Sequence, residues 1–350
     1  MSFINLFSTF VITSISLFAL KPVAARLGLL DIPGGRKIHK TPTPLVGGLG
    51  IYLGTLCMSV FTPAVLQQYS AMLAISALVL FIGIFDDARE LRVSVRMGAH
   101  AFAAWLMAAV AGNQLLSLGN LLAFGPIELG VLAIPLTIFA TVGVINAINM
   151  TDGIDGLSGG LALISLTFLC IIAFIAGNVA MLQFGTLLIC SLLAFLVFNF
   201  RHPWKKSAMV YLGDAGSTLL GFILVWLIIE ATQGSNAMMS PVYALWFLAI
   251  PLIDTVSLLI KRPLRGISAF SAGTDHVHHR LIASGYTHEQ TVVGLYVAAI
   301  VAGTFGLVGY LYNVSEAMMF ASFMAVFAVY MAWGKLMRFM KVKPKQVEPV

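Results

Sequence analysis

Charge is scarce in this sequence, and negative charge most of all. Charged side chains make up 10% of its 350 residues, and Asp and Glu together number only 14. A soluble domain of this length would carry about 25% charged residues. The composition therefore excludes an ordinary soluble enzyme, and we expect no nucleic-acid partner.

Cysteine is also rare. The three cysteines (Cys57, Cys170 and Cys190) all lie inside apolar runs, without the CxxC spacing of a redox or zinc site. We interpret them as small core residues. The short alternating segments of a membrane β-barrel are absent as well, which leaves helices as the means of crossing a membrane.

Long apolar runs are what the sequence has in abundance. Hydrophobic residues make up 59% of the chain, and runs of about 20 such residues suit membrane-spanning helices. We predict an all-α polytopic membrane protein with one transmembrane domain (1–334), an uncleaved first span and a basic cytoplasmic tail (335–350). The eleven expected spans cover 2–20, 45–62, 71–85, 97–112, 129–148, 159–176, 181–200, 215–232, 242–260, 291–312 and 317–334.

Positive charge falls on one side of these spans. All 20 Lys and Arg residues lie in connections that follow an odd-numbered span, or in the tail. Because basic connections stay in the cytoplasm, the pattern predicts an outside amino terminus and a cytoplasmic carboxyl terminus. A net charge of +6 is then explained by basic loops that face membrane lipid.

Five aspartates stand where apolar runs meet cytoplasmic connections: Asp86, Asp87, Asp152, Asp155 and Asp214. A carboxylate at the edge of a membrane span is costly unless it is hydrated, paired or bound to a metal. Their shared position predicts a site for a divalent cation and a phosphate on the cytoplasmic surface.

Simpler interpretations exist for each motif. Arg89 and Arg92 would neutralise Asp86 and Asp87 at a helix end, and Asp214 would serve as an N-cap. The glycine-rich NAINMTDGIDGLSGG segment would be a tight turn between helices, although its amides, carboxylates and backbone N–H groups also suit a nucleotide or a hydrated metal. Basic loops would simply bind anionic lipid.

A histidine motif adds a further candidate site. Three imidazoles lie within four residues, at His276, His278 and His279, and Arg280 follows them. This group suits a pyrophosphate better than zinc, since no fourth ligand of suitable spacing is evident. Tyr211, three residues before Asp214, offers a surface on which a base would stack.

Together these motifs resemble the polyprenyl-phosphate N-acetylhexosamine-1-phosphate transferases, and within them the WecA-like bacterial branch. FDDxxxLxVSVR, NAxNxxDGIDGL, GDAGSTLxGF and HxHH occur in the family's order over roughly residues 20–290. The resemblance implies eleven spans in a bacterial inner membrane. It implies transfer of GlcNAc-1-phosphate from UDP-GlcNAc to undecaprenyl phosphate with Mg²⁺ or Mn²⁺, which begins O-antigen or enterobacterial common antigen synthesis.

The resemblance also implies roles for individual residues. Asp214 would bind the metal, and Asp155 would contact uracil with Tyr211 stacked on it. Asn149 and Asp152 would lie near the nucleotide and metal, while Lys40 and, less directly, Asn199 would face substrate. Asp86 is the family's candidate base.

Our own expectation for the acidic pair differs, because a phosphate monoester is already mostly ionised at pH 7. We expect Asp86 and Asp87 chiefly to shape the metal and phosphate site. We leave open another UDP-N-acetylhexosamine donor, a route through an aspartyl-phosphate and a homodimer. A cation- or proton-coupled secondary transporter is the rival class.

Overall fold

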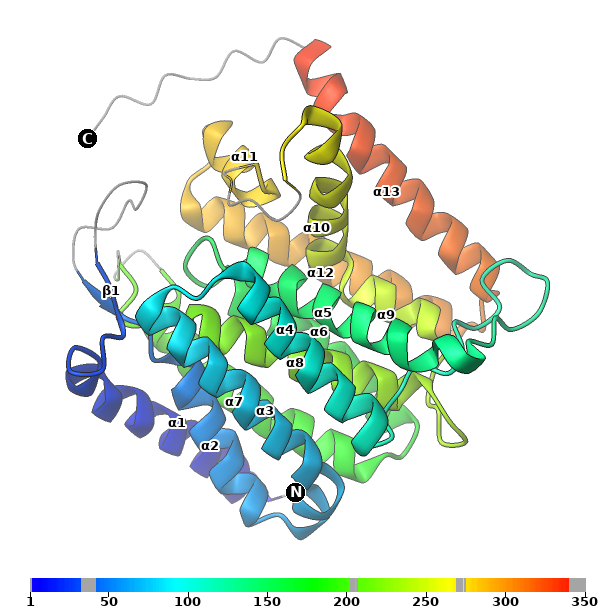
Figure 1. Ribbon diagram of the computed structural model, residues 1–350. Helices are drawn as coiled ribbons and strands as arrows, with labels where there is room; N and C mark the ends of the chain where they lie inside the picture. Colours follow the sequence, from blue (N-terminus) through cyan, green and yellow to red (C-terminus); the bar gives the residue numbers. More distant parts are fainter. Residues whose placement is uncertain are drawn as a thin grey trace.

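The chain folds into a bundle of apolar helices (Figure 1). The computed structural model describes residues 2–32, 42–201, 205, 207–268, 273 and 275–339, with side chains to residue 332. The helices within these residues are α1 (Phe3–Ala24), α2 (Gly47–Val60), α3 (Pro63–Arg89), α4 (Val93–Trp105), α5 (Ala133–Met150), α6 (Leu157–Ile175), α7 (Val179–Asn199), α8 (Gly213–Thr232), α9 (Pro241–Phe247), α10 (Ala249–Lys261), α11 (Val277–Ala283), α12 (His288–Leu311) and α13 (Glu316–Phe339).

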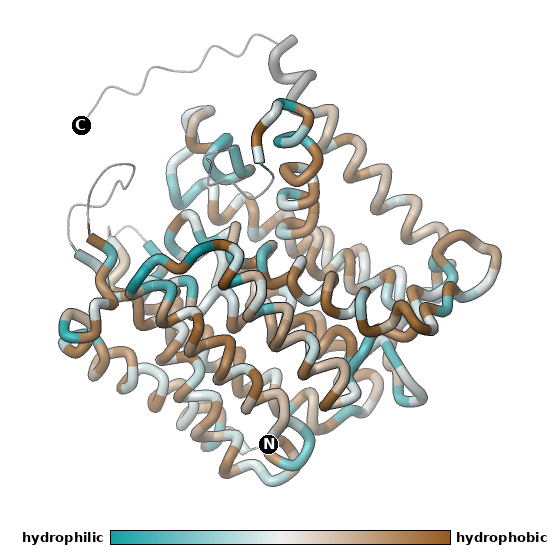
Figure 2. Tube along the Cα trace, viewed as in Figure 1, coloured by the Kyte–Doolittle hydropathy of each residue, from teal (hydrophilic) through white to brown (hydrophobic). Residues whose placement is uncertain are grey.

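Short elements complete the described structure. A π-helical turn, η1 (Leu106–Val110), continues α4, and 3₁₀ turns form η2 (Gly130–Leu132) and η3 (Pro263–Arg265). The strands β1 (Leu30–Asp31) and β2 (Thr43–Pro44) pair antiparallel. Hydrophobic residues cover most of the length of the helices, and hydrophilic ones gather toward their ends (Figure 2).

Each of the eleven expected spans coincides with one of these helices or with a pair of consecutive ones. By length and composition, eight helices of the described chain are able to cross a membrane, and the bent pair α9–α10 would make a ninth. α2 and the Glu316–Ala332 part of α13 are apolar but shorter. The structure thus agrees with an all-α polytopic membrane protein, while the count of eleven and the sidedness stay predictions.

Two helices differ from their expected ranges for identifiable reasons. α3 begins at Pro63 instead of residue 71, because polar residues such as Gln68 interrupt the apolar run without breaking the helix. The expected span 242–260 is bent by 89° between α9 and α10. Pro251 cannot donate to the carbonyl of Phe247, and the hydroxyl of Ser165 donates to that carbonyl instead, at 2.7 Å.

α8 is the buried centre of the bundle, and small residues bring its neighbours close. Over the most apolar 18 residues of α8, 89% of the residues are buried. A Cβ on Gly83 of α3 would lie 2.3 Å from the Cα of Ala215, and one on Gly48 of α2 would lie 2.4 Å from the Cα of Gly216. These glycines allow backbone contact at the amino terminus of α8, where Asp214 lies.

We therefore expect Gly83→Ala to force α3 away from α8. Overpacking of this kind costs about 1–3 kcal/mol, so thermal unfolding in detergent should occur at lower temperature. Gly143→Ala on α5 is the matched control, because a Cβ there meets nothing within 4 Å. Equal unfolding temperatures for the two variants would contradict the close approach of α3 and α8.

Candidate active site

The five aspartates converge on one cavity. It has a volume of about 500 Å³ and lies at one end of the bundle, where α3 ends and α8 begins. Its described lining contains Asp31, Asp86, Asp87, Glu90, Asp152, Asp155, Asn199, Arg201, Tyr211, Asp214, His279 and His288, with glycine and apolar residues between them. Helix ends that are far apart in the sequence thus form a single acidic site.

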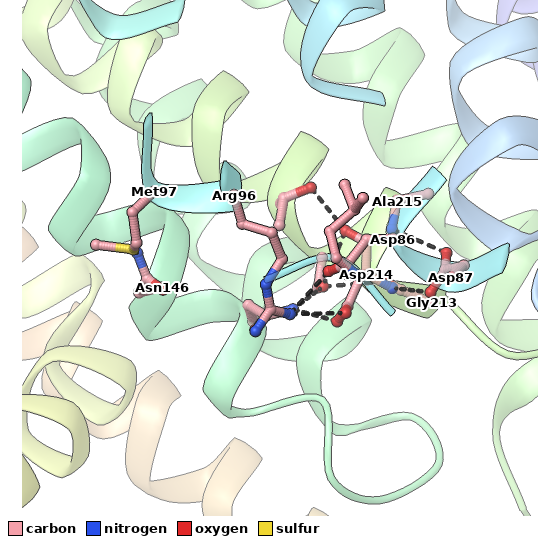
Figure 3. Close-up of polar contacts among 12 residues, drawn as sticks. Asp86, Asp87, Arg96, Met97, Asn146, Gly213, Asp214 and Ala215 are labelled. Atoms are coloured by element: carbon pink, nitrogen blue, oxygen red, sulfur yellow. Dashed lines mark hydrogen bonds and ion pairs between the residues drawn. The ribbon is translucent and has the colours of Figure 1, made fainter. Parts of the chain in front are cut away.

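Arg96 contacts two of the acids through one nitrogen (Figure 3). Its Nη1 is 2.7 Å from Oδ2 of Asp86 and 3.2 Å from Oδ2 of Asp214. Asp86 is 5% exposed and also accepts the backbone N–H of Leu91, at 2.8 Å. The cation that neutralises Asp86 is therefore Arg96 of α4, whereas the sequence suggested Arg89 and Arg92.

Asp87 caps the helix that carries Asp214. Its Oδ1 accepts the N–H of Asp214 at 2.8 Å, and its Oδ2 accepts the N–H of Ala215 at 3.1 Å. These groups belong to the first turn of α8, where backbone N–H groups lack helical partners and favour negative charge. Gly213 makes room, since its φ is +75° and a Cβ would lie 2.5 Å from Asp87. Asp214 is not itself the N-cap.

Asn149 orients Asp214 from the other side. Its Nδ2 is 2.7 Å from Oδ1 of Asp214 and 2.9 Å from Oγ of Ser217. Because Arg96 binds Oδ2 and Asn149 binds Oδ1, both oxygens of Asp214 have fixed directions. Asn149 is not among the described residues that line the cavity, so the structure places it behind Asp214.

The loop between α5 and α6 brings Asp152 and Asp155 to the cavity. Burial raises the pKa of Asp152 well above its usual value, and the charges of Asp214, Asp87 and Asp155 raise it further. Asp155 forms an ion pair with Arg201 through Oδ2 and Nε. A bound cation would stabilise the ionised form of a carboxylate whose pKa is raised in this way.

Asn199 connects this loop to the segment before α8. Its Oδ1 accepts the N–H of Gly156 at 2.6 Å, and its Nδ2 donates to the carbonyl of Val210 at 2.9 Å. Tyr211 follows Val210 and lines the cavity, held by backbone hydrogen bonds to Pro44 and Gly47. Asn199 therefore holds the walls of the cavity in place as well as lining it.

The residues of the histidine motif differ in whether they reach the cavity. His279 lines the cavity, whereas His276 and His278 are buried and Arg280 is half-buried, none of the three being among the described lining. Burial and its histidine neighbours lower the pKa of His278 to about 3, and burial lowers that of His279 as well. At pH 7 these two imidazoles are neutral.

The sequence prediction missed several residues of the site: some line the cavity, and Arg96 contacts two of its acids without lining it. Lys40, which the prediction included, lies outside the described residues. Arg96 and Arg201 are the important omissions, because each pairs with one of the five aspartates. Arg96 closes the FDDxxxLxVSVR motif, so a signal for it was present. His288 at the start of α12, Glu90 and Asp31 had no comparable signal.

The donor set fits Mg²⁺ or Mn²⁺. Carboxylate oxygens and an amide surround the cavity, and these are the hard ligands that such ions prefer. Among the described residues, no group of three or more His, Cys, Asp or Glu side chains is arranged to hold a metal alone. Mg²⁺ usually takes only one or two carboxylates and completes its shell with substrate phosphates and water, so the two observations agree.

Comparison with known proteins decides the family. The profile of glycosyl transferase family 4 matches residues 69–232. Undecaprenyl-phosphate alpha-N-acetylglucosaminyl 1-phosphate transferases are similar over nearly the whole chain. The Haemophilus influenzae protein is 36% identical over 99% of both chains. The Salmonella typhi protein is 37% identical over 96% of this chain and 93% of its own, and the Yersinia pestis protein 35% over 95% and 92%.

The chain belongs to this transferase family. Such similarity over both full lengths covers the cavity and the histidine motif, which lies beyond the matched profile. The expected family is thereby confirmed, and the chain is a bacterial-type sugar-1-phosphate transferase with several membrane helices. The roles of single residues in this transferase remain predictions.

Proposed function

We propose that this transferase moves GlcNAc-1-phosphate from UDP-GlcNAc to undecaprenyl phosphate and releases UMP. The observation that carries the proposal is the convergence of all five aspartates on one cavity, in a chain whose full-length relatives bear the name of that activity. The cavity lies at a helix end, where a cytosolic nucleotide sugar and a membrane-bound lipid phosphate are able to meet. We propose that the transferase lies in the bacterial inner membrane. Its reaction would be the first step of O-antigen or enterobacterial common antigen synthesis.

Asp214 and Asp152, which both line the cavity, would hold Mg²⁺ or Mn²⁺. The ion, when bound, supplies positive charge to phosphoryl oxygens. Asn149 keeps the Asp214 side chain oriented, and Asp87 holds the first turn of α8, as their hydrogen bonds indicate. Arg96 supplies a second, permanent cation beside Asp214 and Asp86.

Tyr211 and Asp155 would bind the uridine. Tyr211 and Asp155 both line the cavity. The ring of Tyr211 would stack on uracil, and the carboxylate of Asp155 would accept the imide N–H of uracil. Arg201 fixes Asp155 through Oδ2 and so limits the directions that this carboxylate takes. The neutral imidazole of His279 would donate a hydrogen bond to the pyrophosphate.

The reaction itself needs in-line positioning and charge neutralisation. An oxygen of the lipid phosphate bonds to the β-phosphorus of UDP-GlcNAc, and the bond from that phosphorus to the bridging oxygen breaks. UMP leaves with that oxygen. Asp86 and Asp87 already accept three backbone N–H groups and Arg96, an arrangement that suits support of the site better than proton removal or nucleophilic attack.

The rival function, secondary transport, has less support. Transporter sites lie near the bilayer midplane on broken helices, whereas these aspartates gather at one end of the bundle. Two acids outside the cavity, Glu230 and Asp254, are each held by hydrogen bonds from a tyrosine and other groups.

The deciding assay uses the purified chain, Mg²⁺, undecaprenyl phosphate and a panel of labelled UDP-sugars. We expect UMP release with UDP-GlcNAc, and its dependence on undecaprenyl phosphate. Faster release with another UDP-N-acetylhexosamine would correct the donor. Absence of UMP with every donor would reject the transferase proposal, and isolation of a phosphosugar–enzyme adduct would replace direct attack by double displacement.

A further inference from the structure

A buried carboxylate outside the cavity, Asp254, collects three hydrogen bonds from two distant parts of the chain. Asp254 lies in α10 and is 2% exposed. Its Oδ1 accepts the hydroxyl of Tyr330 at 2.7 Å and the N–H of Val277 at 3.0 Å. Its Oδ2 is 2.8 Å from Nδ1 of His276. A carboxylate in a membrane helix is costly to bury, so this full set of donors marks a built arrangement.

The carboxylate of Asp254 caps the helix that carries the histidine motif. Val277 is the first residue of α11, and no side chain of α11's own N-cap residue, His276, caps it. Asp254 supplies the missing acceptor and a negative charge at the amino terminus. Asp87 does the same for α8. In α8 and in α11, a carboxylate from another apolar helix therefore replaces the local cap.

A second contact, from Arg262 at the carboxyl end of α10, reinforces the first. Arg262, also 2% exposed, binds Asp275 through two nitrogens, at 2.6 and 3.2 Å. Paired contacts of this kind fix direction as well as distance. Residues 275–277 are therefore attached at two points, to Asp254 within α10 and to Arg262 immediately after it.

The histidine rings transmit this attachment to the cavity. Because the carboxylate of Asp254 only accepts, Nδ1 of His276 carries the proton. The rings of His276 and His278 stack, with centroids 5.6 Å apart and planes 11° apart, and the ring of His279 lies 4.2 Å from that of His278. His278 in turn rests on the loop that carries Asp152, since a Cβ on Gly153 would lie 2.2 Å from its Nε2.

From this chain of contacts we propose that Asp254 is a positioning residue for the transfer reaction, acting through His276 to set the place of His279 in the cavity. The inference rests on the proposed function, because it assigns His279 to the phosphate site. Through the hydrogen bond of Tyr330, α13 also helps to hold Asp254, although α13 contributes no described residue to the cavity.

Kinetics of Asp254→Asn test the proposal. Loss of a residue that orients a functional group typically costs 10- to 100-fold in activity, so we expect kcat/KM for UMP release to fall by about that factor. Glu230→Gln is the matched control. Glu230 is also a carboxylate in a membrane helix that accepts a tyrosine hydroxyl, from Tyr69 at 3.1 Å, yet it does not line the cavity. We expect its kcat/KM to stay within about twofold of wild type.

A double-variant cycle separates positioning from general damage. If Asp254 acts through the histidine motif, Asp254→Asn should cost almost nothing further in a His279→Gln background. Equal losses in the two backgrounds would overturn the proposal, as would full activity of Asp254→Asn in a preparation whose wild type releases UMP.

Mobility of α11 gives a readout that does not depend on activity. A nitroxide on Ser284→Cys, at the exposed end of α11, in a background with the three native cysteines replaced by Ala, reports the order of that helix. We expect a narrower, more mobile spectrum for Asp254→Asn and an unchanged one for Glu230→Gln. Unchanged spectra for both variants would reject the positioning role even if the transferase assay itself failed.

Discussion

Asp214→Asn is expected to lower kcat/KM for UMP release by about 10³-fold, the scale of losing one preorganised charge at a transferring phosphoryl group. Asp214 is the acid that the most residues of the site hold in place. Arg96 and Asn149 bind its two oxygens, and Asp87 accepts its backbone N–H. Asparagine keeps the shape of the side chain but removes the charge that a divalent cation requires.

The control for this variant is Glu289→Gln. Glu289 is exposed and belongs to α12, whose first residue, His288, lines the cavity, so the change removes one carboxylate near the same end of the bundle. We expect its kcat/KM to stay within about twofold of wild type. Direct binding of Mn²⁺, followed by electron paramagnetic resonance, should weaken in Asp214→Asn and stay the same in Glu289→Gln. Unaltered Mn²⁺ affinity in Asp214→Asn would move the metal to other carboxylates.

The sequence predicts much of this fold because a membrane simplifies the problem. Apolar runs locate the helices, and the position of Lys and Arg predicts which helix ends lie together. All five aspartates were expected on one side for that reason, and all five line the cavity. The bend between α9 and α10 also had a local cause in Pro251, although the apolar run alone suggested a straight helix.

Side-chain partners were harder to predict, because helices that are apolar on every face give no rotational signal. Arg89, Arg92 and Arg96 all follow Asp86 closely, and only the packing of α4 against α5 and α3 brings Arg96 to Asp86 and Asp214. The histidines show the same limit. The sequence pattern gives the three histidines the same predicted role. In the fold, His276 contacts Asp254, His278 contacts Gly153 and His279 lines the cavity.

Asp86→Asn separates a supporting role from a base role. We expect a loss in kcat/KM of about 10²-fold, similar at pH 6 and at pH 8.5, because Asn no longer neutralises Arg96 and holds the Leu91 N–H less well. The pH pair is informative because the second pKa of a phosphate monoester is about 6. At pH 6 about half of the lipid phosphate would still need to lose a proton, whereas at pH 8.5 almost none would.

A base role makes the opposite prediction. If Asp86 removed that proton, Asp86→Asn would be severely impaired at pH 6 and would largely recover at pH 8.5, where the nucleophile is already ionised. Arg96→Gln provides the matched comparison, since it breaks the same ion pair but removes no base. Similar losses for Asp86→Asn and Arg96→Gln at both pH values would assign both residues to the electrostatic framework around Asp214. Recovery of Asp86→Asn alone at pH 8.5 would instead make Asp86 the base, despite its buried hydrogen bonds.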